Sequence, residues 1–144
     1  LKYAWGLCLD KDINTVMMVD EAHVLLSNHN ELGAEFLSQI QRRARKYNTG
    51  TIVITQQPTD FAAPNLIMHG KAIFDNASTY LIMNLRKQAV DDLSKLIDLN
   101  ETEMERIKYY NQGEGLLICG NRRMNMTVIA TQEELDSFGS GGGY

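Results

Sequence analysis

A short apolar run that ends in two adjacent carboxylates constrains this chain more than any other feature. Residues Val16–Val19 (Val-Met-Met-Val) are followed directly by Asp20 and Glu21. A run this short, apolar on both faces, is typical of a buried central strand of a parallel sheet. Two neighbouring carboxylates at the end of such a strand repel each other and resist desolvation, and a bound cation relieves that cost.

A helix and a second apolar run follow at the spacing of a βαβ unit. Ser27–Asn30 is a polar segment, and we expect it to interrupt the regular structure and to supply residues that cap the next helix. Apolar side chains then recur at helical spacing from Glu31 to Tyr47, and Asn48–Gly50 offers a residue suited to a left-handed cap. Thr51–Thr55 is a β-branched run that predicts a second buried strand. The order predicts two parallel strands joined by a right-handed crossover.

The rest of the chain predicts further helices and a late pair of strands. Helices are expected just after Pro58 and over residues 65–76, 88–97 and 101–110, and strands over 79–85, 115–120 and 124–131. The predicted fold class is therefore α/β, with parallel core strands, helices on both faces of the sheet and a hairpin at its edge. We expect one domain over residues 1–138 and a glycine-rich flexible tail over 139–144.

Composition excludes several classes of function. The formal net charge of the 144 residues is −4, so the chain is not a basic nucleic-acid coat and any contact with DNA must be local. Cys8 and Cys119 are far apart and lack metal-ligand spacing, and the three histidines lack zinc spacing. No stretch approaches the roughly 20 apolar residues of a membrane span.

The carboxylates at the first strand end have a chemical use in enzymes that transfer phosphoryl groups. Open α/β sheets bind ligands at the carboxyl ends of their strands. At that edge Asp20 can hold Mg²⁺, directly or through water, and Glu21 can polarise an attacking water molecule. The bland alternative is that Asp20 caps a turn and that Glu21 is merely solvated.

The second strand end argues against the bland alternative. Thr55–Gln57 follows what should be the neighbouring strand. Gln56, or with weaker support Gln57, can hydrogen-bond both the attacking water and the γ-phosphate of a nucleotide. A plain turn glutamine before Pro58 remains the alternative.

The densest positive run in this acidic chain lies near the end of the predicted helix, at Gln41–Lys46. On a helical wheel Arg42 and Arg45 point away from the apolar stripe, and Arg43 lies beside it. Three explanations stay open. The cations can form a solvated face that is favoured near a helix C-terminus. They can reach the γ-phosphate of a neighbouring subunit, or they can bind a DNA backbone.

Two sequence motifs narrow the class of protein to which the chain can belong. His23 completes the letters Asp-Glu-Ala-His of one helicase class, but the next strand ends in Thr-Gln-Gln rather than Ser-Ala-Thr, so we reject that class. The phosphate-binding motif Gly-x-x-x-x-Gly-Lys-Ser/Thr is absent. Gly70-Lys71 does not form this motif, because Asn65 stands in place of its first glycine and Ala72 in place of its Ser/Thr. We therefore expect the chain to be the C-terminal part of a longer polypeptide.

The order of these motifs and predicted elements resembles the end of the large conjugative-transfer ATPases of type IV secretion systems, the VirB/TrbE kind. These belong to the HerA/FtsK-like branch of RecA-type motors. The resemblance spans most of Val16 to Phe138. It rests on Val16–His23, Glu35-Phe36, Gln41–Gly50, Ile52–Phe61, Gly113–Leu117, Met124–Ala130 and Glu133–Phe138. The most telling element is the Gln-Arg-Arg-Ala-Arg-Lys-Tyr run followed by the Thr-Gln-Gln strand end.

The resemblance implies a partial RecA-like sheet that lacks the P-loop strand and helix, and a site that uses ATP and Mg²⁺. It makes Asp20 the Walker B magnesium carboxylate, Glu21 the catalytic glutamate and Gln56 the sensor glutamine. It makes Arg45, with Arg42 or Arg43 as alternatives, the arginine that acts across a hexamer interface.

The same resemblance implies the partners and the location of the full-length protein. They are other subunits of the ATPase, membrane components of a secretion complex and, as a candidate substrate, DNA or a DNA–protein complex, at the cytoplasmic face of the membrane. The isolated fragment is expected to be inactive. The alternatives are a DNA translocase of the HerA/FtsK kind and a non-catalytic interaction module of the same fold.

Overall fold

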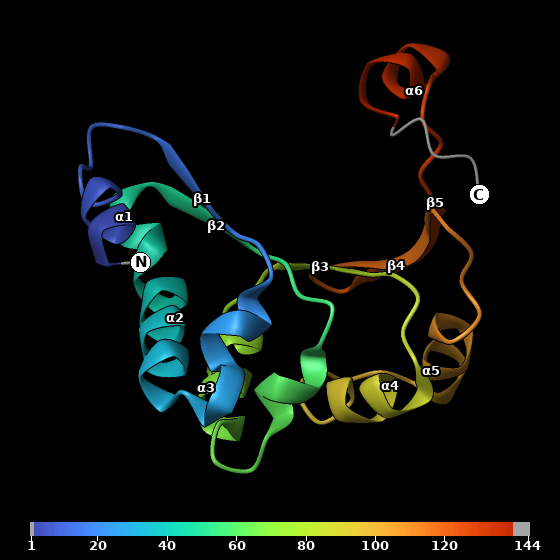
Figure 1. Cartoon of the computed structure of the whole chain (residues 1–144), viewed down its shortest axis with the longest axis horizontal. Helices are drawn as coiled ribbons and strands as arrows, with labels where there is room; N and C mark the ends of the chain where they lie inside the picture. Colours follow the sequence, from blue (N-terminus) through green and yellow to red (C-terminus); the bar gives the residue numbers. More distant parts are fainter. Residues whose placement is uncertain (1, 140–144) are drawn as a thin grey trace.

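The computed structural model describes residues 2–139, so that most of the tail predicted over 139–144 lies outside the described residues. Its helices (α, and η for 3-10 helices) and strands alternate along the chain (Figure 1). In chain order they are α1 (Lys2–Leu7), β1 (Thr15–Val19), η1 (Ala22–His29), α2 (Glu31–Arg43), η2 (Ala44–Tyr47), β2 (Thr49–Val53), η3 (Pro58–Ala62), α3 (Ile67–Asp75), β3 (Thr79–Ile82), α4 (Lys87–Leu93), α5 (Glu101–Ile107), β4 (Glu114–Cys119), β5 (Arg122–Thr127) and α6 (Gln132–Phe138).

The strands form two sheets, which contain the two predicted pairings, β1 with β2 and β4 with β5, and a pairing of β3 with β4 that was not predicted. β1 and β2 are parallel, in a register that runs from Thr15 opposite Thr49 to Val19 opposite Val53. With α2 between them they form the predicted βαβ unit. The second sheet has the antiparallel order β3-β4-β5, so that the late hairpin lies at an edge as predicted. The α/β fold class predicted from the sequence is confirmed.

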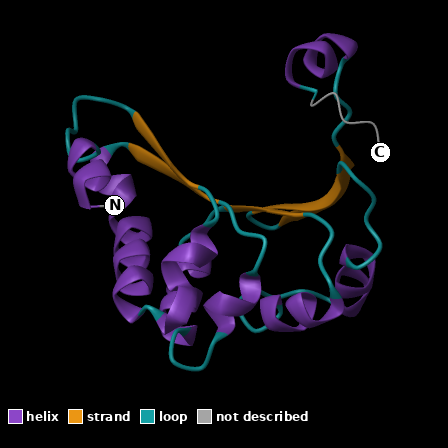
Figure 2. Ribbon diagram, viewed as in Figure 1, coloured by secondary structure: helices purple, strands orange, loops and turns teal. Residues whose placement is uncertain are grey.

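The coverage of the sheets differs from the prediction. In the described residues, helices α1 to α5 lie along one side of the strands, and α6 stands off beyond β5 (Figure 2). Met17 in β1 is 8% exposed, whereas its neighbours Val16 and Met18 are 66% and 60% exposed. β1 is thus half-buried rather than buried on both faces, because alternate side chains of a strand point to opposite faces. The same bare face carries exposed apolar residues of the other strands, among them Ile52, Leu81 and Met124.

Three groups of buried side chains attach the helices to the sheets. The first joins η1, α2, η3 and α3 around Leu37, Phe61 and Leu66. The second joins α4 and α5 to β3 and β4 around Val90 and Ile107. The third places α1 beside β1 and α2, and its members are Trp5, Cys8, Met17, Ile40 and Ala44. Cys8 in this group is a small buried core residue, whereas Cys119, which lies in an apolar run of the sequence, is exposed.

Three elements differ from the sequence predictions. α1 lies in the first dozen residues, where no period was found, and it is held by the contacts of Trp5. The expected polar break at Ser27–Asn30 is wrong, because 3-10 helix η1 continues to His29. Asn30 nevertheless caps α2, since its side chain accepts the Gly33 N–H at 3.1 Å. α6 begins with a capping box of Thr131 and Glu134, a sequence signal that would have predicted it.

A close contact between α3 and η3 explains why the residue before Lys71 is a glycine. Gly70 is buried, and a Cβ atom placed there would lie 2.1 Å from the carbonyl oxygen of Phe61. No real Cβ approaches a backbone atom so closely, and a backbone carbonyl cannot turn aside as a flexible side chain can. Gly70 therefore serves packing, not phosphate binding.

We predict that Gly70→Ala lowers the free energy of unfolding by about 1–3 kcal/mol, because the added methyl group forces α3 away from η3. Urea denaturation of the purified chain measures the change. Gly6→Ala is the matched control, since nothing lies within 4 Å of a Cβ at that helical position. It should raise stability by about 0.5–1 kcal/mol. Equal stability of the two variants would show that the contact is not tight in solution.

Candidate functional site

The carboxyl edge of the β1–β2 pair is organised by backbone hydrogen bonds that continue beyond both strands. The Ile54 N–H donates to the Val19 carbonyl at 2.9 Å, and the Ala22 N–H donates to the Ile54 carbonyl at 2.9 Å. Ala22 is fully buried. These bonds pin the turn that carries Asp20 and Glu21 against the segment that follows β2.

The backbone of Glu21 is in the left-handed region, with φ of +49°. Its N–H donates to the Oδ1 atom of Asp20 at 2.8 Å, which holds the Asp20 carboxylate against the backbone of Glu21. A non-glycine residue in this conformation is disfavoured by about 1–2 kcal/mol. Such strain persists where surrounding contacts enforce it, and it clusters at functional sites.

The structure brings together two of the residues predicted for the site. The Gln56 Nε2 atom donates to the Glu21 Oε1 atom at 2.5 Å, across 35 positions of sequence. Gln57 does not join them in the same way. Its side chain is exposed, and its backbone N–H donates to the Thr55 hydroxyl at 3.1 Å.

The other oxygen of the Glu21 carboxylate faces a histidine. The Nδ1 atom of His23 lies 3.2 Å from the Glu21 Oε2 atom. Both atoms are almost inaccessible to solvent, and in the described part of the chain neither has an aligned hydrogen bond. The distance is that of a contact pair, but the pair does not form a hydrogen bond. This contact was not predicted from the sequence, where His23 was weighed only as part of a helicase motif and as a zinc ligand, although its position two residues after Glu21 could have suggested it.

The structure does not bring the candidate arginines to Glu21. Arg42 and Arg43 end α2, Arg45 lies in η2, and all three are exposed. In a βαβ unit the crossover helix runs antiparallel to its strands, so its C-terminus lies near their amino ends (Figure 1). A five-residue strand spans roughly 16 Å, which places these arginines at the opposite end of the sheet from Glu21.

The donor set fits a magnesium ion better than a metal held by protein alone. Among the described residues no group of three or more His, Cys, Asp or Glu side chains is arranged to hold a metal. Mg²⁺ keeps several waters and is commonly bound by one or two carboxylates together with phosphate oxygens of the substrate. The exposed Asp20 carboxylate at the strand end suits that role.

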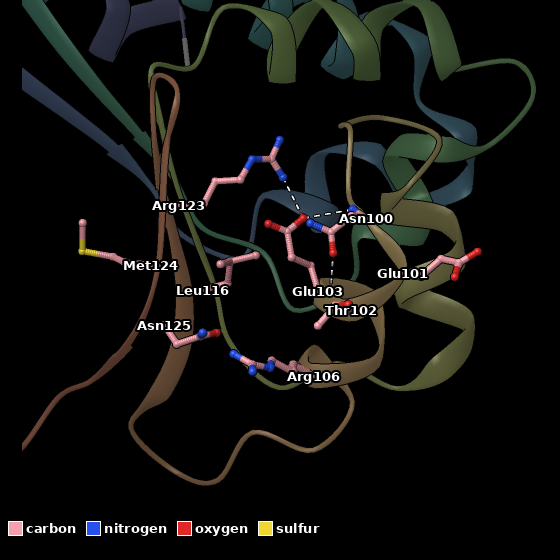
Figure 3. Close-up of a pocket in the computed structure, with 9 residues that line it drawn as sticks. All are labelled: Asn100, Glu101, Thr102, Glu103, Arg106, Leu116, Arg123, Met124 and Asn125. Atoms are coloured by element: carbon pink, nitrogen blue, oxygen red, sulfur yellow. Dashed lines mark hydrogen bonds and ion pairs between the residues drawn. The ribbon is translucent and has the colours of Figure 1, made fainter.

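A pocket lies elsewhere in the described part of the molecule. It has a volume of about 510 Å³ and lies between α5 and the β4–β5 hairpin (Figure 3). Two of its charged lining residues pair with each other, since Arg123 Nη1 donates to Glu103 Oε2 at 2.7 Å, and Glu103 also forms a capping box with Asn100 at the start of α5. None of its lining residues lies at the carboxyl edge of β1 and β2. The pocket is therefore separate from the site predicted from the sequence.

Comparison with known proteins defines the class. The chain matches the TraG P-loop domain family over residues 7–120 and belongs to that family. It is also similar to the solved VirB4 of Thermoanaerobacter pseudethanolicus, with a TM-score of 0.84 and 31% identity, over 92% of this chain and 36% of that one. An uncharacterized protein of Bacillus anthracis is 21% identical over 88% of this chain and 21% of its own length. The predicted resemblance to conjugative ATPases is thus confirmed.

The coverage shows that the chain spans only a part of these relatives, about a third of the VirB4 chain and a fifth of the Bacillus protein. No helix among the described residues has both the length and the apolar character needed to cross a bilayer.

Two substitutions test whether the left-handed backbone conformation at Glu21 is strained. Glu21→Gly and Glu21→Ala both remove the side-chain contacts, so they differ only in backbone preference. We predict that the glycine variant is more stable than the alanine variant by about 1 kcal/mol, as measured by urea denaturation.

The same pair of substitutions at Glu31, an exposed residue in the first turn of α2, is the matched control. There the alanine variant should be the more stable, because glycine weakens a helix. The same order at both positions would contradict the strained geometry.

Proposed function

We propose that this chain carries the hydrolytic half of the ATP site of a motor ATPase from a conjugation or type IV secretion machine. The observation that carries the proposal is the hydrogen bond between Glu21 and Gln56. It joins a carboxylate and an amide at adjacent ends of two parallel strands, where open α/β sheets bind ligands. Membership of the TraG P-loop family and the likeness to VirB4 support it.

In this proposal each residue at the edge has one task. Asp20 is the Walker B carboxylate that holds Mg²⁺ through water, and the ion neutralises charge on the phosphate oxygens of ATP when bound. Glu21 orients the attacking water and accepts its proton. Gln56 senses the γ-phosphate by moving its amide from Glu21 to the nucleotide, with Gln57 beside it at the nucleotide edge.

The phosphate-binding loop has to come from outside this chain. The motif Gly-x-x-x-x-Gly-Lys-Ser/Thr is absent from the 144 residues. The chain covers 36% of the VirB4 chain, so such a loop has room in the remainder of a full-length relative. The isolated chain is therefore expected to hydrolyse ATP negligibly.

The position of the arginines favours a role between subunits. Arg42, Arg43 and Arg45 lie at the far end of the sheet from Glu21, so they cannot serve the Glu21 site of their own chain. We propose that Arg45, or else Arg42 or Arg43, reaches the γ-phosphate bound to a neighbouring subunit of a hexamer. A DNA backbone is the alternative ligand for this exposed basic run.

The assembly proposed is a hexamer at the cytoplasmic face of the membrane. Its partners there are the membrane components of the secretion complex and a DNA or DNA–protein substrate. Two other functions remain to be tested, a DNA translocase of the HerA/FtsK kind and a non-catalytic interaction module. A parent gene without the phosphate-binding motif upstream would favour the module, and an upstream DNA-channel domain would favour the translocase.

In the full-length parent protein, we predict that Glu21→Gln lowers kcat for ATP hydrolysis by about 10²–10⁴-fold, because the general base is lost. ATP binding should persist, since the amide keeps the shape of the carboxylate. Phosphate release and nucleotide binding are the two measurements. Glu31→Gln, exposed on α2, is the control and should keep the parent rate.

Wild-type turnover by full-length Glu21→Gln would refute the role of Glu21. Steady Mg²⁺-dependent turnover by the purified 144-residue chain, lost on Glu21→Gln, would refute the need for an external phosphate-binding loop.

Mixing two inactive full-length variants tests the arginine. If Arg45 acts across the interface, Arg45→Ala subunits supply an intact Glu21 and Glu21→Gln subunits supply an intact arginine. Mixed oligomers should then recover part of the ATPase rate that neither variant shows alone. Arg42→Ala and Arg43→Ala, tested in the same mixture, identify which arginine acts. If none of the three arginine variants loses activity, or if none complements Glu21→Gln, the arginine does not act across the interface. A DNA backbone and a solvated helix face then remain as explanations of the basic run.

A further inference from the structure

The Glu21 carboxylate is held from two sides by groups of different origin. Gln56 Nε2 contacts Oε1 at 2.5 Å, and His23 Nδ1 contacts Oε2 at 3.2 Å. Gln56 follows β2, on the neighbouring strand, whereas His23 lies in η1, in the same turn as Glu21. The two contacts therefore respond differently when a ligand enters the edge of the sheet.

The His23 contact is fixed by the local backbone. Between the two residues, Ala22 is fully buried and its N–H donates to the Ile54 carbonyl. The N–H of Val24 donates to the Glu21 carbonyl at 2.9 Å and closes the turn. The imidazole is only 20% exposed. His23 thus stays beside Glu21 for as long as this turn is formed.

The chemistry of the two groups decides which one donates and which one accepts a hydrogen bond. A carboxylate oxygen can only accept a hydrogen bond, so the approach is favourable when the Nδ1 atom of His23 carries its hydrogen. Glu21 Oε2 and His23 Nδ1 are buried, and in the described part of the chain each is the partner within reach of the other. An unpaired buried polar atom is costly, so a small rotation that aligns the pair is favoured.

We propose that His23 is a positioning residue that keeps the Glu21 carboxylate oriented toward the attacking water when Gln56 turns away to the γ-phosphate. The proposal rests on the hydrolytic role proposed for Glu21. His23 does not itself touch the nucleotide. It donates through Nδ1 to Glu21 Oε2, which leaves Oε1 free to accept from water once the Gln56 amide has left.

Two amide substitutions separate this role from simple packing. An asparagine side chain can place its amide nitrogen where the Nδ1 atom of histidine lies, and a glutamine side chain places its amide nitrogen near the position of Nε2. In the full-length ATPase, His23→Ala and His23→Gln should lower kcat about tenfold, which corresponds to about 1.4 kcal/mol, with the KM for ATP unchanged. His23→Asn should retain a rate close to that of the parent.

The outcomes distinguish a failure of the positioning role of His23 from a failure of the hydrolytic role of Glu21, on which it rests. If Glu21→Gln keeps full activity, the hydrolytic role of Glu21 fails and the role of His23 falls with it. If Glu21→Gln is inactive but His23→Ala turns over at the parental rate, only the inference on His23 fails. Equal rates for the asparagine and glutamine variants, or a rise in KM without a change in kcat, also overturn it. Loss of folding in all three His23 variants, seen by thermal denaturation, would assign His23 to stability instead and overturn positioning.

Discussion

The site depends on the backbone hydrogen bonds that carry the β1–β2 pairing past the ends of both strands. Val19 accepts from Ile54, and Ile54 accepts from Ala22, so the chain is held on both sides of Glu21. Backbone constraints of this kind can maintain a conformation that a non-glycine residue otherwise avoids. The left-handed turn at Glu21 and the approach of its side chain to Gln56 both follow from that anchoring.

The βαβ topology divides the proposed functional groups between the two ends of one small sheet. The carboxylates and the glutamine lie at the carboxyl ends of β1 and β2, and the basic run lies where α2 returns to the amino ends. A single chain with this arrangement does not bring Arg42, Arg43 or Arg45 to its own Glu21 site. A subunit interface that stacks one end of the sheet on the other would bring both sets together, as the proposed hexamer requires.

The sequence predictions succeeded where the pattern is local and failed where distant contacts decide. β1, α2, β2 and the late hairpin were predicted from apolar period and β-branched runs. α1 was missed because it is short and is stabilised by the packing of Trp5 on Met17 and Ile40, which no local pattern encodes. The expectation of helices on both faces was wrong for the described residues, since an apolar run does not reveal which face is covered.

The sequence by itself determined the βαβ unit and the chemical groups at its two ends, because hydrophobic period and residue type are local properties. It placed Asp20, Glu21 and Gln56 at strand ends and the arginines at a helix end. Only the tertiary structure decided that Glu21 adopts a left-handed backbone, that Gln56 reaches it across 35 positions, and that the Nδ1 atom of His23 lies 3.2 Å from its second carboxylate oxygen. These features depend on the register of β1 against β2 and on a turn pinned by Ala22, which are set by contacts between distant segments.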